Sequence, residues 1–490
     1  MLRWPILAAA VLAAAAPFAA SADPGDVFYV DADNQSGVEN GLSWATAHRT
    51  VAAGIETARR NFGGDVWVAE GVYDETRDAT GGSLVLVSGV NLYGGFAGTE
   101  TLRAQRNPLT HPAIIDGSSA NAGAPAAPVV VGVSGAALDG FTVQGGRGEV
   151  GAGLILNEIS PTIANCVFTD NETTGFGGAV ICIGAASPRF VNCVFTNNRS
   201  AKSGGAVTNT GATPSFEGCL FSLNEAAEAG GAIFNTPGSD ILVTDCTFER
   251  NTAQAGGGAI FNEGASPSLT RSTFLRNSSG SFGGAIFNNF ATDAGIASDV
   301  LATNCVFAKN TAVTGGGAIS TLGSSFTAVN CTIADNTAPE TGGGAFFNND
   351  ADTEVLNSII WYNSDGWIEN YLSFTEIRWS NVGGGDRGPN NIAREPRFAD
   401  RANDDYSLLP DSPSIDAGTA SGAPAVDIRG VARPQFDGVD QGAYEALERT
   451  LPEGMNCHDA NGQATTADGL TLLAACMLLA GLRASGARRR

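Results

Sequence analysis

Apolar residues alternate with polar or small residues in short runs along most of the chain, and glycine-containing turns separate the runs. A spacing of two indicates β-strands with one buried face, because a helix would repeat its apolar positions every three or four residues. A first strand is expected at 27–30 and a helix at about 50–60. The pattern predicts an all-β protein that begins with a helical cap.

A repeat of 26 or 27 residues, with one step of 33, organises the strands. Each copy places an apolar residue two positions after a Cys or Ser and three positions before an Asn. Three short strands per copy are too short to form a stable sheet alone, but they can pair in register with the next copy. The repeat therefore predicts a right-handed parallel β-helix, a single-stranded solenoid with three short strands per coil. The apolar positions are Phe168, Phe195, Phe221, Phe248, Phe274, Phe307, Ile333 and Ile360.

The cysteines of the repeat are expected on the buried face. Residues two apart in a strand point the same way, so Cys193 accompanies Phe195 into the core. Cysteines on neighbouring parallel strands stand about 4.8 Å apart with side chains pointing alike, a poor orientation for bridging. We expect most of them to be buried thiols, with inter-coil disulfides as the alternative.

Two columns of asparagine mark turns of the coil. Identical amides one coil apart can donate to and accept from one another, which predicts asparagine ladders, and Asn tolerates the left-handed backbone angles of a corner. Gly-Gly pairs, such as Gly204 with Gly205, permit another tight corner. The first column is Asn171, Asn198, Asn224, Asn251, Asn277, Asn310, Asn336 and Asn363. The second column is Asn209, Asn235, Asn262, Asn288 and Asn348.

The pairing of an FxxN motif with a GGA[IV] motif over residues 166–348 resembles the repeats of chlamydial polymorphic membrane proteins. More broadly, it resembles the pectin-lyase-like β-helix superfamily. The resemblance implies a surface-exposed protein of the adhesin type. The segment that begins VFYVDADNQSG is similar to the N-terminal cap of secreted bacterial β-helix proteins, and the segment from EPRFAD to DQGAYE resembles the choice-of-anchor Q region.

The chain divides into five predicted parts. Residues 1–22 combine a cationic start, a short apolar run and a small-x-small end, which indicates a secretory signal peptide. The next parts are an N-terminal cap at 23–65, the β-helix at 66–365 with regular coils at 160–365, and a closing module at 366–447. Residues 448–490 hold a short apolar helix and an arginine cluster, and they resemble the C-terminal sorting tails of bacterial surface proteins.

The tail also contains the skeleton of a calcium loop of the dockerin or EF-hand type. Asp459, Asn461 and Asp468 occupy ligand positions, whereas Cys457 stands where the first carboxylate belongs. No cofactor is expected, and a structural calcium ion is the alternative left open; a small soluble helix completing a degenerate dockerin is the rival interpretation of the tail. The acids of the closing module are expected to be turn and cap residues rather than calcium ligands: Asp416, Asp427, Asp437 and Asp440.

Charge narrows the choice of partners. The 50 acidic and 27 basic residues give a net charge of −23, which disfavours nucleic acid and anionic surfaces. Polysaccharide lyases and hydrolases of this fold place acids, with or without calcium, and a basic residue on outward positions of neighbouring coils, and the outward columns of the repeat show no paired carboxylates. The column two residues after Phe offers instead a short basic stack, Arg250, Arg276 and Lys309, and Glu249 beside Arg250 is expected to form a surface ion pair. The irregular coils at 66–160, with Asp116, Asp139 and Arg147, remain the alternative place for a catalytic site.

One outward column is aromatic. Strand parity places Phe234, Phe261, Phe287 and Phe347 on the outer face, where they form a candidate ligand-binding stripe for sugar rings or an apolar partner. The alternatives are that a loop covers them or that the strand parity inverts at the glycine corner. The seven-residue insertion of the longer copy, within 289–299, is expected to leave the coil as a loop.

These patterns together favour a secreted, surface-attached β-helix scaffold or adhesin that binds extracellular carbohydrate or a cell-surface component. We expect a monomer without nucleic-acid partners that contacts a membrane only through its C-terminal tail, and we expect it at the cell surface, in the outer membrane or outside the cell. A polysaccharide lyase or glycoside hydrolase of the same fold is the alternative.

Overall fold

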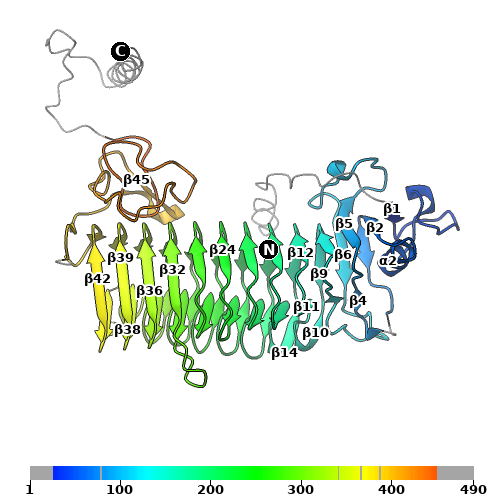
Figure 1. Ribbon diagram of the computed structural model, residues 1–490, viewed down its shortest axis with the longest axis horizontal. Helices are drawn as coiled ribbons and strands as arrows, with labels where there is room; N and C mark the ends of the chain where they lie inside the picture. Colours follow the sequence, from blue (N-terminus) through cyan, green and yellow to red (C-terminus); the bar gives the residue numbers. More distant parts are fainter. Residues whose placement is uncertain (1–25, 78–79, 340, 365–366, 386–387, 450–490) are drawn as a thin grey trace, which may run out of the picture.

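The computed structural model describes residues 26–77, 80–339, 341–364, 367–385 and 388–449. The expected signal peptide at 1–22 and nearly all of the expected tail, with Asp459, Asn461 and Asp468, lie outside the described residues. Figure 1 shows a long parallel β-solenoid, with helix α2 (Val51–Arg60) at one end and a separate module, which contains β45 (Asp405–Leu408), above the last coils. None of the described helices is long and apolar enough to cross a membrane.

Sheet 1 runs the length of the solenoid and has 13 strands within the described residues. All of its neighbours pair in parallel, and each strand belongs to a different coil. In spatial order the strands are β1 (Val27–Val30), β2 (Gly64–Ala69), β5 (Val90–Phe96), β8 (Ala137–Asp139), β12 (Thr162–Ala164), β16 (Arg189–Val191), β20 (Ser215–Glu217), β24 (Leu242–Thr244), β28 (Ser268–Thr270), β32 (Asp299–Thr303), β36 (Ser325–Val329), β39 (Asp352–Leu356) and β42 (Phe374–Arg378).

Sheet 2 follows sheet 1 in each coil and carries the Cys-x-Phe segment. The pairing Phe168 with Phe195 and Phe195 with Phe221 confirms the predicted in-register stacking of copies. Its strands are β3 (Gly71–Tyr73), β6 (Ala113–Asp116), β9 (Phe141–Gln144), β13 (Val167–Thr169), β17 (Val194–Thr196), β21 (Leu220–Ser222), β25 (Thr247–Glu249), β29 (Thr273–Leu275), β33 (Val306–Ala308), β37 (Thr332–Ala334), β40 (Ile359–Trp361) and β43 (Asn381–Val382).

Sheet 3 is an addition to the three strands per coil that the sequence predicts. It consists mostly of two-residue strands that follow the first asparagine column, too short for a hydrophobic pattern to reveal them. Its strands are β10 (Arg147–Val150), β14 (Glu172–Phe176), β18 (Arg199–Ser200), β22 (Glu225–Ala226), β26 (Thr252–Ala253), β30 (Ser278–Ser279) and β34 (Thr311–Ala312).

Sheet 4 follows the Gly-Gly corner and completes the coil. Its strands are β4 (Leu84–Val85), β7 (Val130–Val131), β11 (Leu154–Asn157), β15 (Val180–Ile183), β19 (Val207–Thr210), β23 (Ile233–Asn235), β27 (Ile260–Glu263), β31 (Ile286–Asn289), β35 (Ile319–Leu322), β38 (Phe346–Asn349) and β41 (Ile368–Tyr371). Because β41, β42 and β43 extend three of the sheets, the solenoid continues to Val382, past the expected boundary at 365.

The core is a stack of like residues. The rings of Phe195 and Phe221 are 4.6 Å apart and nearly parallel, and the same stacking runs from Phe168 to Phe307. All seven cysteines within the described residues are buried free thiols, as predicted for most of them. In the Cys-x-Phe column the side chains point alike along the stack, a poor orientation for bridging, and Cys182 lies apart from that column on β15. The Cys166 thiol donates to carbonyl oxygens of its own and the preceding coil.

The first asparagine column forms the predicted ladder. Asn198 Nδ2 donates to Asn224 Oδ1 at 3.0 Å and to the Phe168 carbonyl at 2.9 Å, while the backbone N–H of Asn198 donates to the same Asn224 Oδ1. The bond repeats from Asn171 to Asn363. The left-handed residue of this corner is not the asparagine but the residue before it, such as Asn197 with φ 54°. The ladder asparagine thus supplies the hydrogen bonds of the corner, and the residue before it adopts the left-handed conformation that turns the chain.

The N-terminal end is closed by α2, which begins at the predicted position. Thr50 Oγ1 accepts a hydrogen bond from Ala53 N at 3.2 Å and caps the helix. Val51, Ile55 and Ala58 join the solenoid core, and Gly54 lies so close to Val30 that a Cβ there would overlap it. The helix therefore covers the first coil, where the interior would otherwise meet water.

Because the solenoid continues to Val382, the closing module comprises residues 388–449 and not the predicted 366–447. It packs on the outer face of sheet 2 rather than across the end of the solenoid (Figure 1). Its antiparallel pair, β44 (Phe398–Asp400) and β45, flanks the short helix η4 (Arg401–Asn403). Phe398 and Tyr406 bury the outward residues Val306 and Ile359 of sheet 2. The sequence identified those residues as outward but gave no sign that they are covered.

Candidate ligand-binding surface

The four predicted phenylalanines lie on the outer side of sheet 4. Phe234, Phe261 and Phe287 belong to a cluster separate from the solenoid core, and Phe347 joins it through Phe282. Register places Phe234, Phe261 and Phe287 on adjacent coils of β23, β27 and β31, with Ser320 and then Phe347 following in the same column. The expected exposure is wrong for two of them, since Phe261 and Phe287 are 8% and 6% exposed. Phe234 and Phe347 are half-buried.

The two buried rings are covered by the backbone that precedes the Gly-Gly corner, not by a loop. Phe287 lies against Gly256, where a Cβ would stand 2.3 Å from the ring, and Phe261 packs with Ala229. A small residue directly before Gly-Gly, such as Ala229 or Gly256, leaves room for a phenylalanine ring of the next coil. Where the position holds Phe176 or Phe282, the next coil has the small residues Thr208 or Ser320 in the ring column.

Two further phenylalanines complete the set, so that the rings form a continuous line, called the aromatic strip below. It consists of Phe176, Phe234, Phe261, Phe287, Phe282 and Phe347, in order of contact. Successive ring centroids are 6.5, 5.4, 5.0, 5.7 and 5.2 Å apart. Sequence reasoning missed Phe176 and Phe282; the signal was a phenylalanine directly before Gly-Gly, in GFGGAV and SFGGAI.

The basic column on the other side of the coil has a structural partner. Arg276 and Lys309 both contact the Asp404 carboxylate of the closing module, at 2.7 Å each. Although burial opposes it, hydrogen bonds from Lys309 and Arg276 hold the pKa of Asp404 below its ordinary value. The predicted surface pair Glu249 with Arg250 is present at 2.7 Å. Two of the three cations of the basic stack, Arg276 and Lys309, therefore bind the closing module.

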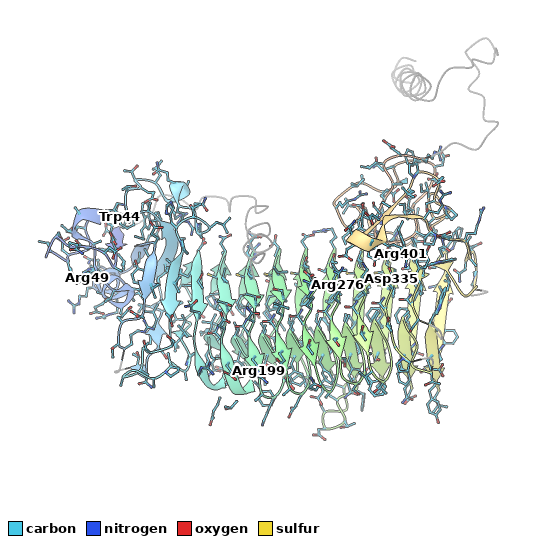
Figure 2. The ribbon with its side chains drawn as sticks, turned by 180° about the vertical axis from the view of Figure 1, so that it is seen from behind. Trp44, Arg49, Arg199, Arg276, Asp335 and Arg401 are labelled. Carbon is cyan, nitrogen blue, oxygen red and sulfur yellow. The ribbon has the colours of Figure 1, made fainter. Side chains whose placement is uncertain are left out.

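Asp335, which follows Lys309 in the same column, makes a partly buried polar contact with the closing module. Asp335 accepts hydrogen bonds from Arg401 and, at 2.9 Å, from the Tyr406 hydroxyl. Burial and the neighbouring Asp335 carboxylate raise the pKa of Tyr406. Figure 2 shows Arg276, Asp335 and Arg401 together where the closing module meets the solenoid.

The two acids and the arginine that the sequence offered for catalysis each bind a different partner. Asp116 accepts from Gln144 Nε2 at 2.8 Å, Asp139 pairs with Arg106 at 2.6 Å, and Arg147 pairs with Glu172. These contacts lie at different strands, β6, β8 and β10, which belong to three different sheets. Each of the three residues thus has its own polar partner, and none of these contacts joins two of them.

The acids of the closing module make turns and ion pairs. Asp427 accepts from the backbone of Arg429, Val431 and Glu445, and Asp440 accepts from Asp416 N and Ala446 N. Within the described part of the chain, no group of three His, Cys, Asp or Glu residues is arranged to hold a metal ion. Asp416 and Asp437 share Arg449 as an ion-pair partner.

Comparison with known families supports the architecture. Residues 129–297 match the right handed β-helix region family, and residues 304–322 match the Chlamydia polymorphic membrane protein repeat. The chain is therefore similar to both in the part where its coils are most regular. The likeness of the C-terminal region to a choice-of-anchor Q module stays a prediction.

Solved structures with a similar fold include a pectate lyase, Pel9A, at 15% identity and a TM-score of 0.46, covering 87% of this chain and 97% of that one. A tailspike protein mutant of E. coli bacteriophage HK620, in complex with a pentasaccharide, matches at 13% identity and a TM-score of 0.30, covering 70% of this chain and 73% of that one. At these values neither structure informs the activity of this chain. The search of curated proteins found no match.

Proposed function

We propose that this right-handed parallel β-helix is an exported surface protein that binds carbohydrate along the aromatic strip. The observation that carries the proposal is the continuity of the strip, six rings across seven coils on the outer surface where the Gly-Gly corner joins sheet 3 to sheet 4. Aromatic side chains bind sugar rings through large rigid areas at little cost in conformational entropy. A row of rings at coil spacing matches a polymer of rings better than it matches a compact ligand.

The partial exposure of the strip favours this use over simple packing. A purely structural row would bury all of its members, as the core phenylalanines are buried, whereas Phe176, Phe234, Phe282 and Phe347 each keep part of their surface in solvent. The match of residues 304–322 to a repeat of polymorphic membrane proteins supports a location at the cell surface.

A glycan array probed with the full-length protein and with a variant carrying Phe234→Leu, Phe282→Leu and Phe347→Leu tests the proposal. Leucine retains apolar packing but removes the aromatic face, so the variant should remain folded and lose at least tenfold in binding. Phe62→Leu, at a fully exposed ring beyond α2, is the matched control and should bind as the wild type does. Equal binding by the variant and wild type, or no binding to any glycan, would overturn the proposal.

The same samples separate binding from catalysis. Incubation of the wild type with each bound glycan should leave its chain length unchanged. Release of unsaturated or reducing ends would instead favour a lyase or hydrolase of this fold, and would redirect the search to acids on other faces of the coils.

A further inference from the structure

Each end of the aromatic strip exposes a pair of rings, and the middle is buried. Phe176 and Phe234, with centroids 6.5 Å apart, form the first pair, and Phe282 and Phe347, 5.2 Å apart, form the second. Between them Phe261 and Phe287 lie beneath Ala229 and Gly256. A ligand on this face therefore meets two separate aromatic platforms.

The distance between the platforms follows from the coil spacing. Phe234 belongs to β23, and Phe282 lies two coils further along, just before β31. Neighbouring parallel strands are about 4.8 Å apart, so the gap is roughly 10 Å and the whole strip extends about 30 Å. A short oligosaccharide can cover one platform, and only a longer chain can cover both.

The columns that flank the strip are nearly uncharged. On the sheet 3 side the exposed residues two positions before the strip are Thr174, Ala201, Ala227, Gln254, Gly280 and Val313, and the sheet 3 strands beyond them carry the ion pairs Arg147–Glu172 and Arg199–Glu225. On the sheet 4 side the strand positions are Ile183, Thr210, Glu263, Asn289, Leu322 and Asn349. These side chains offer hydroxyl and amide groups to a ligand but no row of cations.

The charges that do lie beside the strip disfavour an acidic polymer. Lys202 Nζ is 5.1 Å from the Phe176 ring, and Glu228 follows it one coil later, hydrogen-bonded through its backbone to Lys202. With Glu263 this makes one cation against two carboxylates, on a protein whose net charge is −23. A uronate chain needs a cation for many of its carboxylates, whereas this surface offers Lys202 and, further out, Arg199, which already pairs with Glu225.

From these observations we infer that the aromatic strip, as the carbohydrate site proposed above, is a two-platform site for an uncharged polysaccharide. Each platform holds a short segment of sugar rings, and the linked segments of one chain occupy both. Binding is then bivalent, and affinity rises with the length of the chain because the second platform binds intramolecularly.

The test uses the full-length protein with soluble mixed-linkage β-glucan and xylan as neutral probes, their oligosaccharides of four and of twelve residues, and polygalacturonate as the acidic probe. Titration calorimetry should show that a neutral twelve-residue chain binds at least about tenfold more tightly than the four-residue chain. Polygalacturonate should bind at least about tenfold more weakly than the best neutral polymer, by the cation shortage described above.

Variants of single platforms separate this inference from the proposed function. Phe176→Leu with Phe234→Leu, or Phe282→Leu with Phe347→Leu, should abolish the dependence on length and leave binding of the four-residue chain at the intact platform within about twofold. Loss of all binding with either variant, equal affinity for short and long chains, or preference for polygalacturonate would overturn the two-platform inference alone. If neither variant changes binding to any glycan, the proposed carbohydrate function itself fails. Thermal unfolding of each variant checks that it is folded.

Discussion

The guanidinium carbon of Arg401 lies 3.3 Å from the centre of the Tyr362 ring, and this contact joins the closing module to one of the last coils of the solenoid. Tyr362 also donates to Glu395 at 2.6 Å, and burial together with Glu395 raises the pKa of Tyr362 to about 12. Arg401 therefore contacts both the Tyr362 ring and the Asp335 carboxylate. A module held by such contacts is expected to loosen when one of them is removed.

Replacing Asp335 with alanine should loosen the closing module without unfolding the solenoid. The change leaves Tyr406 without its acceptor and Arg401 without its carboxylate, which should cost about 2 kcal/mol of module stability. Hydrogen exchange of residues 394–410 should accelerate, while exchange in the middle coils stays unchanged. Asp170→Ala is the matched control, because Asp170 occupies the same column in an earlier coil and its carboxylate accepts from Thr169 instead of from the module. Unchanged exchange at 394–410 would show that the contact does not hold the module.

Replacing Thr321 with asparagine should stabilise the solenoid. The second ladder runs from Asn209 to Asn288 and stops, because Thr321 takes the next position before Asn348. Among the described residues Asn288 Nδ2 and Thr321 Oγ1 are buried without hydrogen-bond partners. An amide at 321 would join both halves and add about 1 kcal/mol, measured by chemical denaturation. Thr327→Asn, on the outward side of sheet 1, should give no gain, and destabilisation by Thr321→Asn would contradict the ladder argument.

Replacing Gly256 with alanine tests the packing within the aromatic strip. Its Cβ would meet the Phe287 ring at 2.3 Å, so the variant should lose about 1–3 kcal/mol. Adding Phe287→Leu should restore part of this loss, as a double-mutant cycle would show. Gly384→Ala, with its nearest neighbour at 3.9 Å, is the control and should be nearly neutral. A neutral Gly256→Ala would mean that the ring is free to move away.

The free energy of unfolding should depend on pH through the protonation of Asp440. Burial raises the pKa of this carboxyl from 3.8 to about 7, despite hydrogen bonds from Ala446 and Asp416. The folded state then keeps a proton that the unfolded state releases, so this contribution to stability is complete below pH 3.8 and is lost as pH rises to about 7. The loss is at most about 4 kcal/mol.

Asp440→Asn measures this contribution, since the variant has no group to titrate at that position. The stability of the wild type should fall relative to the variant between about pH 4 and pH 7, as measured by denaturation at several pH values. A difference between the two proteins that stays constant across that range would mean that Asp440 is ionised in the folded protein throughout.

The buried thiols should resist alkylation until the protein unfolds. Burial raises the pKa of the Cys166 thiol to about 12, which leaves almost no thiolate at neutral pH, and all seven described cysteines are shielded from reagent. Mass spectrometry after iodoacetamide treatment should find these peptides unmodified in the native protein and fully modified in denaturant. Modification of Cys193 or Cys219 in the native state would indicate that the coils open locally.

The sequence by itself determined the repeat and nearly everything that depends on it. A residue at a fixed offset meets its counterpart one coil away, so Phe195 on Phe221 and Asn198 on Asn224 follow from spacing alone. Contacts between segments far apart in the chain were decided only by the tertiary structure. No local pattern shows that Asp404 binds Arg276 and Lys309, because that contact depends on where the non-repeating closing module packs on the solenoid. No local pattern shows either that Gly256 leaves room for the ring of Phe287, because that depends on how side chains of different coils fill the same space.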